Sequence, residues 1–320
     1  MTMNALGNMG DNIKMQKRED GSSIFFLHDE TGSGTMTCYS LFEGVFVLFN
    51  DFHLKICYSA FKPHQSMFTI DYCKEGRIEN SIHPEKYTYI SAGDLQMEVR
   101  TQHCGEFYFP LKHYHGITIS ILFPQGSETI RTLLNGFPVD VENLKNKFCR
   151  TSKGYETFIM RSNPQTNHIL AEIYQIPEED RVPYLKIKVL ELLLYLDGMD
   201  ISLAKQQNDF LNFAQVTKIK SLEKRLTSHL DRFYTLAECS SFIDMPLTSM
   251  KKAFIIIYGK SIYAYMKEYR VNAAALLLQD SSKSILEIAN DLGYQNPSKF
   301  SAAFKSLRGL TPRDYRKTLV

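Results

Sequence analysis

The last hundred residues of this chain contain the same pattern twice, and the two copies are fifty residues apart. Apolar, glycine, hydroxyl and tyrosine positions recur at this one offset: Met250 and Phe300, Phe254 and Phe304, Gly259 and Gly309, Ser261 and Thr311, Tyr265 and Tyr315. Each copy is predicted to form a short helix, a tight turn, a second helix that ends at glycine, and a further capped helix. The repeat therefore predicts an all-α C-terminal region built from two copies of one unit.

The second copy shows most clearly which face of each helix is buried. Residues 284–293 (SILEIANDLG) place their apolar side chains on one helical face: Ile285, Ile288, Ala289 and Leu292. Gly293 supplies a left-handed residue that ends this helix, and Asn296 with Pro297 is typical of an N-cap and first helical position. The next helix, residues 298–308, is predicted to bury Phe300, Phe304 and Leu307. With its basic residues outward, this pattern indicates a helix-turn-helix motif, whose second helix enters the DNA major groove.

At these residues the chain resembles the AraC/XylS family of bacterial transcription regulators. The family's C-terminal signature is matched by residues 284–305 and by GLTPRDYR at 309–316, and its first half and linking helix by residues 259–265 and 269–278. The resemblance covers residues 216–320 as a spaced set of positions. It implies a sequence-specific transcription regulator that binds double-stranded DNA, with RNA polymerase as a further expected partner.

The resemblance also assigns the residues expected to touch DNA. In the first reading helix (residues 247–258), Thr248 and Lys252 fall at base-edge positions, and Lys251 is expected to meet phosphate. In the second helix the base-facing positions are Pro297, Ser298, Ser301 and Ala302. Many members carry Arg where this chain has Ala302, which offers only apolar contact to a thymine methyl. Phosphate contacts are expected from Lys299, Lys305 and Arg308. The alternative is that these are ordinary solvated charges on helix faces.

Two further residues of the C-terminal region are expected to be structural. Asp244 stands where the family usually has the turn glycine, and Asp tolerates the left-handed conformation at some strain. Arg270 precedes an apolar run, so we expect it to support the fold rather than bind DNA.

Charge is divided unevenly along the 320 residues. Residues 216–320 contain 17 Lys and Arg against 9 Asp and Glu, a net of +8, which leaves −6 for the remainder of a chain whose total is +2. The length and this asymmetry predict two domains. We expect a flexible arm at residues 1–23, a sensing and dimerisation domain at 24–200, a linker at 201–215 and a DNA-binding domain at 216–320.

The front half is predicted to be a small β-sandwich or barrel. Apolar and alternating segments rich in β-branched and aromatic residues predict six strands, at residues 45–49, 53–58, 67–72, 87–90, 95–99 and 117–123. Turn residues separate them, as at 74–77. The family resemblance implies a cupin-like barrel or sandwich that senses a small ligand, so the expected fold class is α+β.

Helical patterns follow at residues 127–135, 139–148, 166–174 and 181–196. The last carries a broad apolar stripe: Leu185, Val189, Leu192, Leu193 and Leu196. Such a stripe is consistent with core packing, whereas the resemblance implies a homodimer contact through residues 181–196; one helix can serve both through opposite edges.

The composition excludes several classes of protein. The six cysteines are scattered without a CxxC pair, which is typical of buried thiols in a reducing cytosol rather than disulfides or a zinc site. The polar N-terminus lacks a signal-peptide core, and no apolar stretch is long enough to span a bilayer, so we expect a cytoplasmic protein. Nucleotide-binding loops and a catalytic triad order are absent from the sequence, which predicts no enzyme activity and no cofactor.

His113-Tyr-His115 supports a competing hypothesis. On a strand the two imidazoles would share a face, and inside a cupin barrel they could bind a metal. The protein would then be a metal-dependent cupin enzyme or a metal sensor with an accessory DNA-binding domain. No Glu follows at the short spacing such barrels use, so we expect no metal there. A third alternative is a ligand-independent regulator whose front half only dimerises or contacts another protein.

Overall fold

A computed structural model describes most of the chain, namely residues 6–8, 10, 13–83, 86–203, 210–280 and 282–319. Contacts between Cα atoms divide it into two compact units: residues 1–84 with 88–209, and residues 85–87 with 210–320. Of the segment predicted as a linker, residues 204–209 lie outside the described residues, as do residues 1–5, 9 and 11–12 of the predicted arm.

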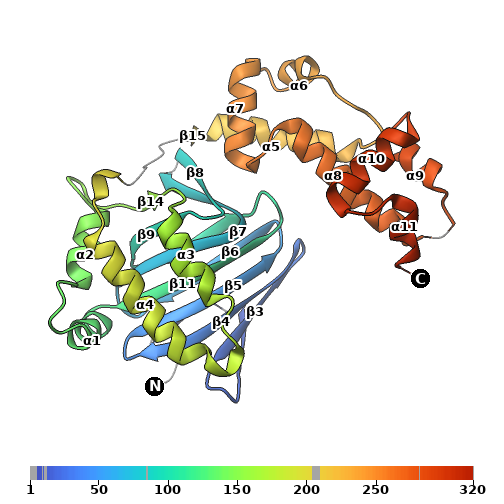
Figure 1. The fold of residues 1–320 in the computed structure, drawn as a ribbon. Helices are drawn as coiled ribbons and strands as arrows, with labels where there is room; N and C mark the ends of the chain where they lie inside the picture. Colours follow the sequence, from blue (N-terminus) through green and yellow to red (C-terminus); the bar gives the residue numbers. More distant parts are fainter. Residues whose placement is uncertain are drawn as a thin grey trace. The chain divides into compact units, whose positions relative to one another are not determined.

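The first unit is built on two antiparallel sheets (Figure 1). The large sheet has the strand order β14-β9-β7-β11-β5-β4-β3-β2, with β8 paired to β7, and the small sheet has the order β1-β6-β10. The strands of these sheets are β1 (Gly7–Asn8), β2 (Ile13–Lys17), β3 (Ser23–Asp29), β4 (Gly32–Phe42), β5 (Val45–His53), β6 (Ile56–Pro63), β7 (Met67–His83), β8 (Lys86–Ser91), β9 (Leu95–Arg100), β10 (His103–Tyr108), β11 (Tyr114–Leu122) and β14 (Phe158–Met160). β12 (Arg150–Thr151) and β13 (Gly154–Tyr155) form a separate hairpin.

Both faces of the large sheet are covered, and β11 shows how. This strand lies between β5 and β7, and its alternate residues face opposite ways. Ile117, Ile119 and Ile121 are at most 1% exposed and pack beneath the helices. Thr118 and Ser120 face the other way and line a cavity that residues of the small sheet also line. The two sheets therefore enclose an interior space, while helices cover the outer face of the large sheet.

Four helices cover that outer face (Figure 1): α1 (Gln125–Leu133), α2 (Val141–Cys149), α3 (Pro164–Ile173) and α4 (Arg181–Gly198). Short 3-10 turns stand at Glu178–Asp180 and Ile201–Leu203. All four helices were predicted, with ends shifted by at most two residues. The apolar stripe of α4 is completely buried in the unit's own core. No helix among the described residues is long and apolar enough to cross a membrane.

The strand predictions need three corrections. The predicted strand at 53–58 is wrong, because β5 ends at His53 and β6 begins at Ile56 in the other sheet. The predicted turn at 74–77 is also wrong, since β7 continues through it with Gly76 at φ 87°. Within the segment predicted as an arm, β2 pairs with β3 and β1 with β6, so residues 7–8 and 13–17 belong to the sheets.

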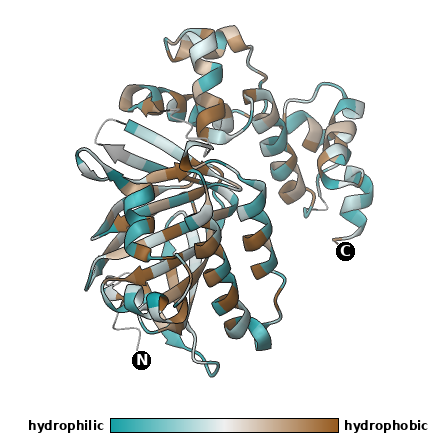
Figure 2. Cartoon of the chain, turned by 60° about the vertical axis from the view of Figure 1, so that its left-hand side comes forward, coloured by the Kyte–Doolittle hydropathy of each residue, from teal (hydrophilic) through white to brown (hydrophobic). Residues whose placement is uncertain are grey.

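The described part of the second unit is helical apart from the short β15 (Leu211–Asn212) and residues 86–87 of β8, with which β15 pairs. Its helices are α5 (Phe213–Ser228), α6 (Leu236–Phe242), α7 (Leu247–Tyr258), α8 (Ile262–Leu277), α9 (Ile285–Asp291), α10 (Pro297–Arg308) and α11 (Pro312–Lys317). Polar and apolar positions alternate along them in Figure 2, as expected of amphipathic helices. The prediction that Leu307 is buried is wrong, since it is 44% exposed. Tyr315 of α11 packs against Phe304, one turn before the end of α10, with their ring centres 5.3 Å apart.

Candidate nucleic-acid interface and interior cavity

The first helix-turn-helix module consists of α6 and α7. Thr235 caps α6 in a reciprocal capping box with Glu238, which satisfies two helix-terminal donors. The turn then requires a left-handed residue, and Asp244 adopts φ 46° there, as the sequence predicted. α7 begins after Pro246, which gives no side-chain cap, and ends at Gly259 with φ 72°.

The second module, α9 and α10, repeats this plan with better caps. Ser284 and Glu287 form the capping box of α9, and Gly293 (φ 79°) makes the turn. A Cβ at this glycine would lie 2.7 Å from the carbonyl oxygen of Asp231, so the turn also needs the close approach that glycine allows. Asn296 caps α10 by accepting hydrogen bonds from two backbone amides, with Pro297 at the first helical position. The predicted N-cap and turn glycine are thus confirmed.

The two reading helices are equivalent in length and register. α7 and α10 each span 12 residues and start exactly fifty residues apart along the chain, at Leu247 and Pro297. Each buries the residues predicted to face the core, including Phe254 and its counterpart Phe304, both 0% exposed, with Leu307 of α10 as the exception. The first turns of the two helices therefore correspond, whereas the last turns differ, because Ile257 and Tyr258 are buried and Leu307 and Arg308 are exposed.

The side chains predicted to contact DNA lie on the outward faces of these helices. On α7, Thr248, Lys251 and Lys252 are all exposed. On α10 the exposed members of the set are Pro297, Ser298, Lys299, Ala302, Lys305 and Arg308, and Ser301 is partly buried. The fold thus makes these side chains accessible, which a DNA contact requires.

Ion pairs hold several of the basic side chains that lie elsewhere in the second unit. Lys283 pairs with Asp291 at 2.8 Å, Arg232 with Glu238 at 2.6 Å, and Lys260 with Glu268. Among the described residues, no ion pair involves the reading-helix side chains Lys251, Lys299 and Lys305. Their charges therefore remain available to an anionic partner.

Two arginines of this unit are held by other protein groups. Arg270 is 3% exposed and donates hydrogen bonds to the carbonyl oxygens of Leu230 and Arg232, while its guanidinium stacks on Phe233. Its predicted structural role is confirmed. Arg308 donates to the Asn272 side chain at 2.9 Å, which ties the end of α10 to α8.

A cavity of about 390 Å³ lies between the sheets of the first unit. Its apolar lining includes Phe52, Phe109 and Tyr114, and its polar lining centres on a buried Arg100. The Arg100 guanidinium lies 2.9 Å from Asp71 and 2.6 Å from Glu98.

The charges along the cavity wall perturb one another. Burial raises the pKa of Asp71 despite the nearby Arg100 guanidinium. Burial would also raise the pKa of Glu98, but attraction to Arg100 outweighs it and the pKa is lowered. Burial, together with Arg100, lowers the pKa of His103 to about 3. The wall thus presents carboxylates and one shared guanidinium beside a neutral imidazole.

Sequence reasoning missed this polar wall, although the pattern of β9 contained the signal. Gln96, Glu98 and Arg100 alternate with Leu95, Met97 and Val99. Such an alternation is typical of a strand with one buried face and one face in solvent. In the structure the polar face is buried as well, because the small sheet covers it.

His113 and His115 do not enter the cavity. Tyr114 between them lines it, so both imidazoles lie on the opposite face of the sheet. Burial lowers the pKa of His115, and Asp51 opposes that shift. The hypothesis of a metal held by this pair inside the barrel therefore lacks its ligands.

Comparison with known proteins concerns mainly the C-terminal unit. Residues 240–318 match the family model of a helix-turn-helix domain. The chain is 24% identical over 127 residues to the transcriptional activator RhaR of Mannheimia succiniciproducens, covering 40% of this chain and 46% of that protein. It is 32% identical over 95 residues to RhaR of Yersinia pseudotuberculosis, covering 30% and 33%. The chain thus spans less than half the length of these relatives.

Two solved structures are similar at low overall scores. The DNA-binding domain of AdpA, solved in complex with a target DNA, matches at 21% identity with a TM-score of 0.31, covering 32% of this chain and 91% of that one. ToxT of Vibrio cholerae matches at 12% identity with a TM-score of 0.29, covering 86% and 99%. Both TM-scores are low. The likeness of the C-terminal unit to helix-turn-helix regulators is therefore carried by the family model and by the sequence relatives.

Proposed function

Since the C-terminal unit of this chain belongs to the AraC/XylS family of transcription regulators, we propose that the protein regulates transcription by binding specific double-stranded DNA sites under the control of a small ligand. The observation that carries this proposal is the pair of equivalent reading helices, α7 and α10, each with an accessible polar face. We take residues 216–320 as the DNA-binding domain and residues 24–200 as the sensing domain. RNA polymerase in the bacterial cytoplasm is then the expected partner.

The two reading helices would enter successive major grooves on one face of the duplex, about 34 Å apart. The linking helix α8 has 16 residues and is therefore about 24 Å long, which suits a rigid spacer between the modules. Base edges would be read by Thr248 and Lys252 and by the first turns of α10. Lys251, Lys299, Lys305 and Arg308 would hold the phosphates.

DNA binding is tested by selecting sequences from a random duplex library with the full-length protein. The selected site is then titrated at two salt concentrations. We expect enrichment of a defined sequence. Affinity should fall by about tenfold or more between low and physiological salt, because several phosphates are contacted. Footprinting should show two protected segments about ten base pairs apart per protomer. Failure to enrich any sequence, or binding that ignores salt, would reject the proposal.

We propose that the cavity of the first unit holds the regulating ligand and that this unit is a cupin-like sensor. Its volume of about 390 Å³ falls within the range of small-molecule pockets, and its lining combines apolar walls with many polar side chains, among them Glu98 and Arg100. Such a lining suits a small organic molecule with an apolar body and one hydrogen-bonding end. A ligand-independent regulator would have no need of this space.

Native mass spectrometry and a thermal-shift screen of small metabolites test that site. Ser59 lines the cavity from β6, so Ser59→Trp should fill it, while Ser40→Trp places the same side chain at an exposed position of β4. We expect a stabilising molecule to act on the wild type and on Ser40→Trp but not on Ser59→Trp. Equal stabilisation of all three proteins would place the ligand elsewhere.

We propose a homodimer through the outer edge of α4, because its inner stripe is occupied by the core. Tyr184 and Ile187 are 51% and 61% exposed and lie one turn apart on that edge. Ile187→Glu should therefore shift sedimentation towards a monomer. Leu133→Glu is the matched control, because Leu133 on α1 is also exposed, at 47%. A dimer that survives Ile187→Glu would contradict this assignment.

A further inference from the structure

A group of imidazole and carboxylate side chains lies on the outer face of the large sheet, away from the cavity. Asp51 and His53 are two residues apart in β5 and share a face, whereas Phe52 between them lines the cavity. The register of β11 against β5 pairs His115 with Asp51 and Tyr114 with Phe52. His113, the residue before β11, therefore lies opposite His53.

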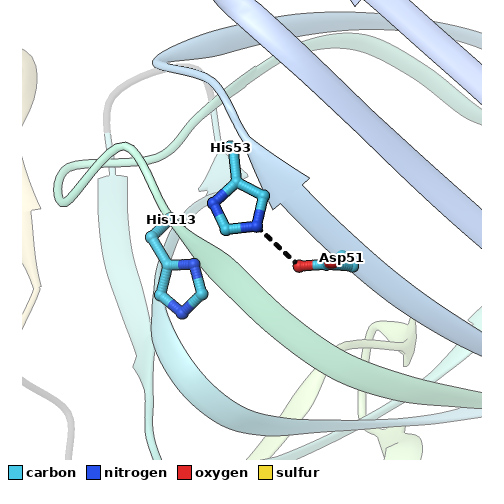
Figure 3. A group of neighbouring side chains, drawn as sticks. All are labelled: Asp51, His53 and His113. Atoms are coloured by element: carbon cyan, nitrogen blue, oxygen red, sulfur yellow. Dashed lines mark ion pairs between the residues drawn. The ribbon is translucent and has the colours of Figure 1, made fainter. Parts of the chain in front are cut away.

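The three side chains converge closely. One ligand-type atom from each of Asp51, His53 and His113 lies within 4.8 Å of the others. His53 Nε2 is 3.0 Å from Asp51 Oδ1, and the two imidazole ring centres are 5.1 Å apart. Figure 3 shows the two rings side by side from different segments, with Asp51 next to His53.

The backbone beneath His113 is fixed by β7. The amide of Arg77 donates a hydrogen bond to the carbonyl oxygen of His113 at 3.4 Å. A Cβ at Gly76 would lie 2.1 Å from that same oxygen, so only glycine allows β7 to approach this closely. The backbone of His113 is thus held beside β7, which favours a built site.

We propose that Asp51, His53 and His113 bind a divalent first-row transition-metal ion, with Zn²⁺ as the reference ion. Imidazole with carboxylate suits this class, whereas Ca²⁺ and Mg²⁺ prefer oxygen ligands throughout. Ligands at about 2.0–2.2 Å around a tetrahedral ion stand about 3.4 Å from one another. Reaching that spacing requires only a side-chain rotation, and His53, which is 61% exposed, has room for it.

Two neighbouring side chains extend the donor set. His115 Nδ1 lies 3.7 Å from Asp51 Oδ1, and Glu75 Oε2 lies 3.5 Å from His113 Nε2. Either can complete the coordination sphere or orient a ligand from behind, as outer partners of metal sites do. The two carboxylates also favour a cation at this point of the sheet.

The proposed ion would join the end of β5 to the start of β11. It would stabilise the first unit by mass action, since the unfolded chain does not hold these residues together. The site shares no residue with the lining of the cavity or with the reading helices, so it stands whether or not the proposed function is correct.

Full-length protein without an affinity tag, treated with a chelator and dialysed, is titrated with Zn²⁺ by calorimetry and with Co²⁺ by visible absorption. All variants carry Cys104→Ser, because Cys104 is an exposed thiol that could bind the ion itself. We expect about one equivalent of Zn²⁺ and an intense Co²⁺ spectrum of low coordination number. His53→Asn and His113→Asn should each weaken binding at least tenfold, in line with the loss of one ligand of three.

His168→Asn is the matched control. His168 is 70% exposed and pairs with Glu172 at 3.5 Å on α3, so it reports what an ordinary surface imidazole contributes. It should leave the affinity unchanged. Thermal midpoints in chelator should agree for all variants, and Zn²⁺ should raise only those of the wild type and the control. Absence of stoichiometric binding, or equal losses in His168→Asn and His113→Asn, would overturn the proposal.

Discussion

In the first helix-turn-helix module the reading helix is held mainly by packing, whereas in the second it is held mainly by its ends. α7 buries five side chains: Met250, Ala253, Phe254, Ile257 and Tyr258. α10 buries two, Phe300 and Phe304, but has a side-chain N-cap and two basic residues in its last turn. α7 has neither of these features.

This difference suggests a division of labour between the modules. Reading a base edge requires a side chain on a precisely held backbone, and close packing provides that. Phosphate contact requires charge more than exact placement. We therefore expect α7 to contribute more to base preference and α10 more to overall affinity.

The largest expected effect concerns the packing of the two modules. Phe254→Ala and Phe300→Ala each remove a completely buried ring, which costs about 3–5 kcal/mol of unfolding free energy. The loss for Phe254→Ala should lie at the upper end of this range, because the ring centre of Phe254 is 4.5 Å from that of Tyr258 and 5.5 Å from that of Tyr265. Amide hydrogen exchange of the full chain gives the stability of each module separately.

Ile255→Ala is the control for that measurement. Ile255 is on the same helix and is 48% exposed, so its loss should cost well below the value for either phenylalanine. If Phe300→Ala proved the more damaging of the two, the contrast in packing between the modules would be reversed.

The next effect separates base reading from phosphate contact. Lys252→Ala should weaken operator binding by about 1–3 kcal/mol and relax base preference at one position. Lys305→Ala should weaken all sequences alike and reduce the salt slope by about one. Ser301→Ala should do less than either. Titration against operator and scrambled duplexes at two salt concentrations distinguishes these outcomes.

Lys283→Ala is the matched lysine control, because its ammonium already pairs with Asp291 outside the reading helices. This substitution should change neither the affinity for the operator nor the salt dependence of binding appreciably. If Lys252→Ala lost affinity equally on both duplexes, Lys252 would be a phosphate contact and α7 would not be the main reader.

The sequence predicted the C-terminal unit in detail because its rules are local. Helix caps, left-handed turn residues and apolar periodicity act over a few residues, so Asn296, Gly293 and Asp244 could be assigned without a structure. The error at Leu307 arose from the one feature that is not local. Periodicity places that residue on the buried face, but burial also requires a neighbouring element, and Leu307 is 44% exposed.

The first unit was predicted less well because strand ends depend on distant partners. Residues 53–58 have the pattern of one continuous strand. In the structure His53 ends a strand of the large sheet, and residues 56–58 begin a strand of the small sheet. The same holds for the Asp51, His53 and His113 cluster, which depends on the register between β5 and β11. No single segment carries that information. The spacing of His113 and His115 predicts that they share a face, but it does not show that this face is the outer one.

A smaller effect is expected at the cap of α10. Asn296→Ala removes the acceptor for the amides of Ser298 and Lys299 and should cost about 0.5–2 kcal/mol of stability. Asn296→Asp keeps that acceptor, so stability should be retained. Its negative charge beside the DNA should still weaken operator binding. Thermal melting together with operator titration of both variants makes the test, and equal stability of all three proteins would show that the cap contributes nothing.

The smallest effect is expected at Asp244, and its sign differs from the others. The residue adopts φ 46°, where an L side chain is strained and glycine is not. Its carboxylate is fully exposed and lies 3.7 Å from Lys218 Nζ, an ion pair that solvent screens and that contributes little. Lys218 also donates a 2.6 Å hydrogen bond to the backbone carbonyl oxygen, which Asp244→Gly preserves. Relief of strain should therefore exceed the added entropy of the unfolded chain and stabilise the first module by up to about 1 kcal/mol.

Asp291→Gly is the control, because it places the same change at the end of helix α9, where it should destabilise the second module. Hydrogen exchange on both variants measures the difference, and a destabilised Asp244→Gly would mean that the turn is held by the aspartate itself.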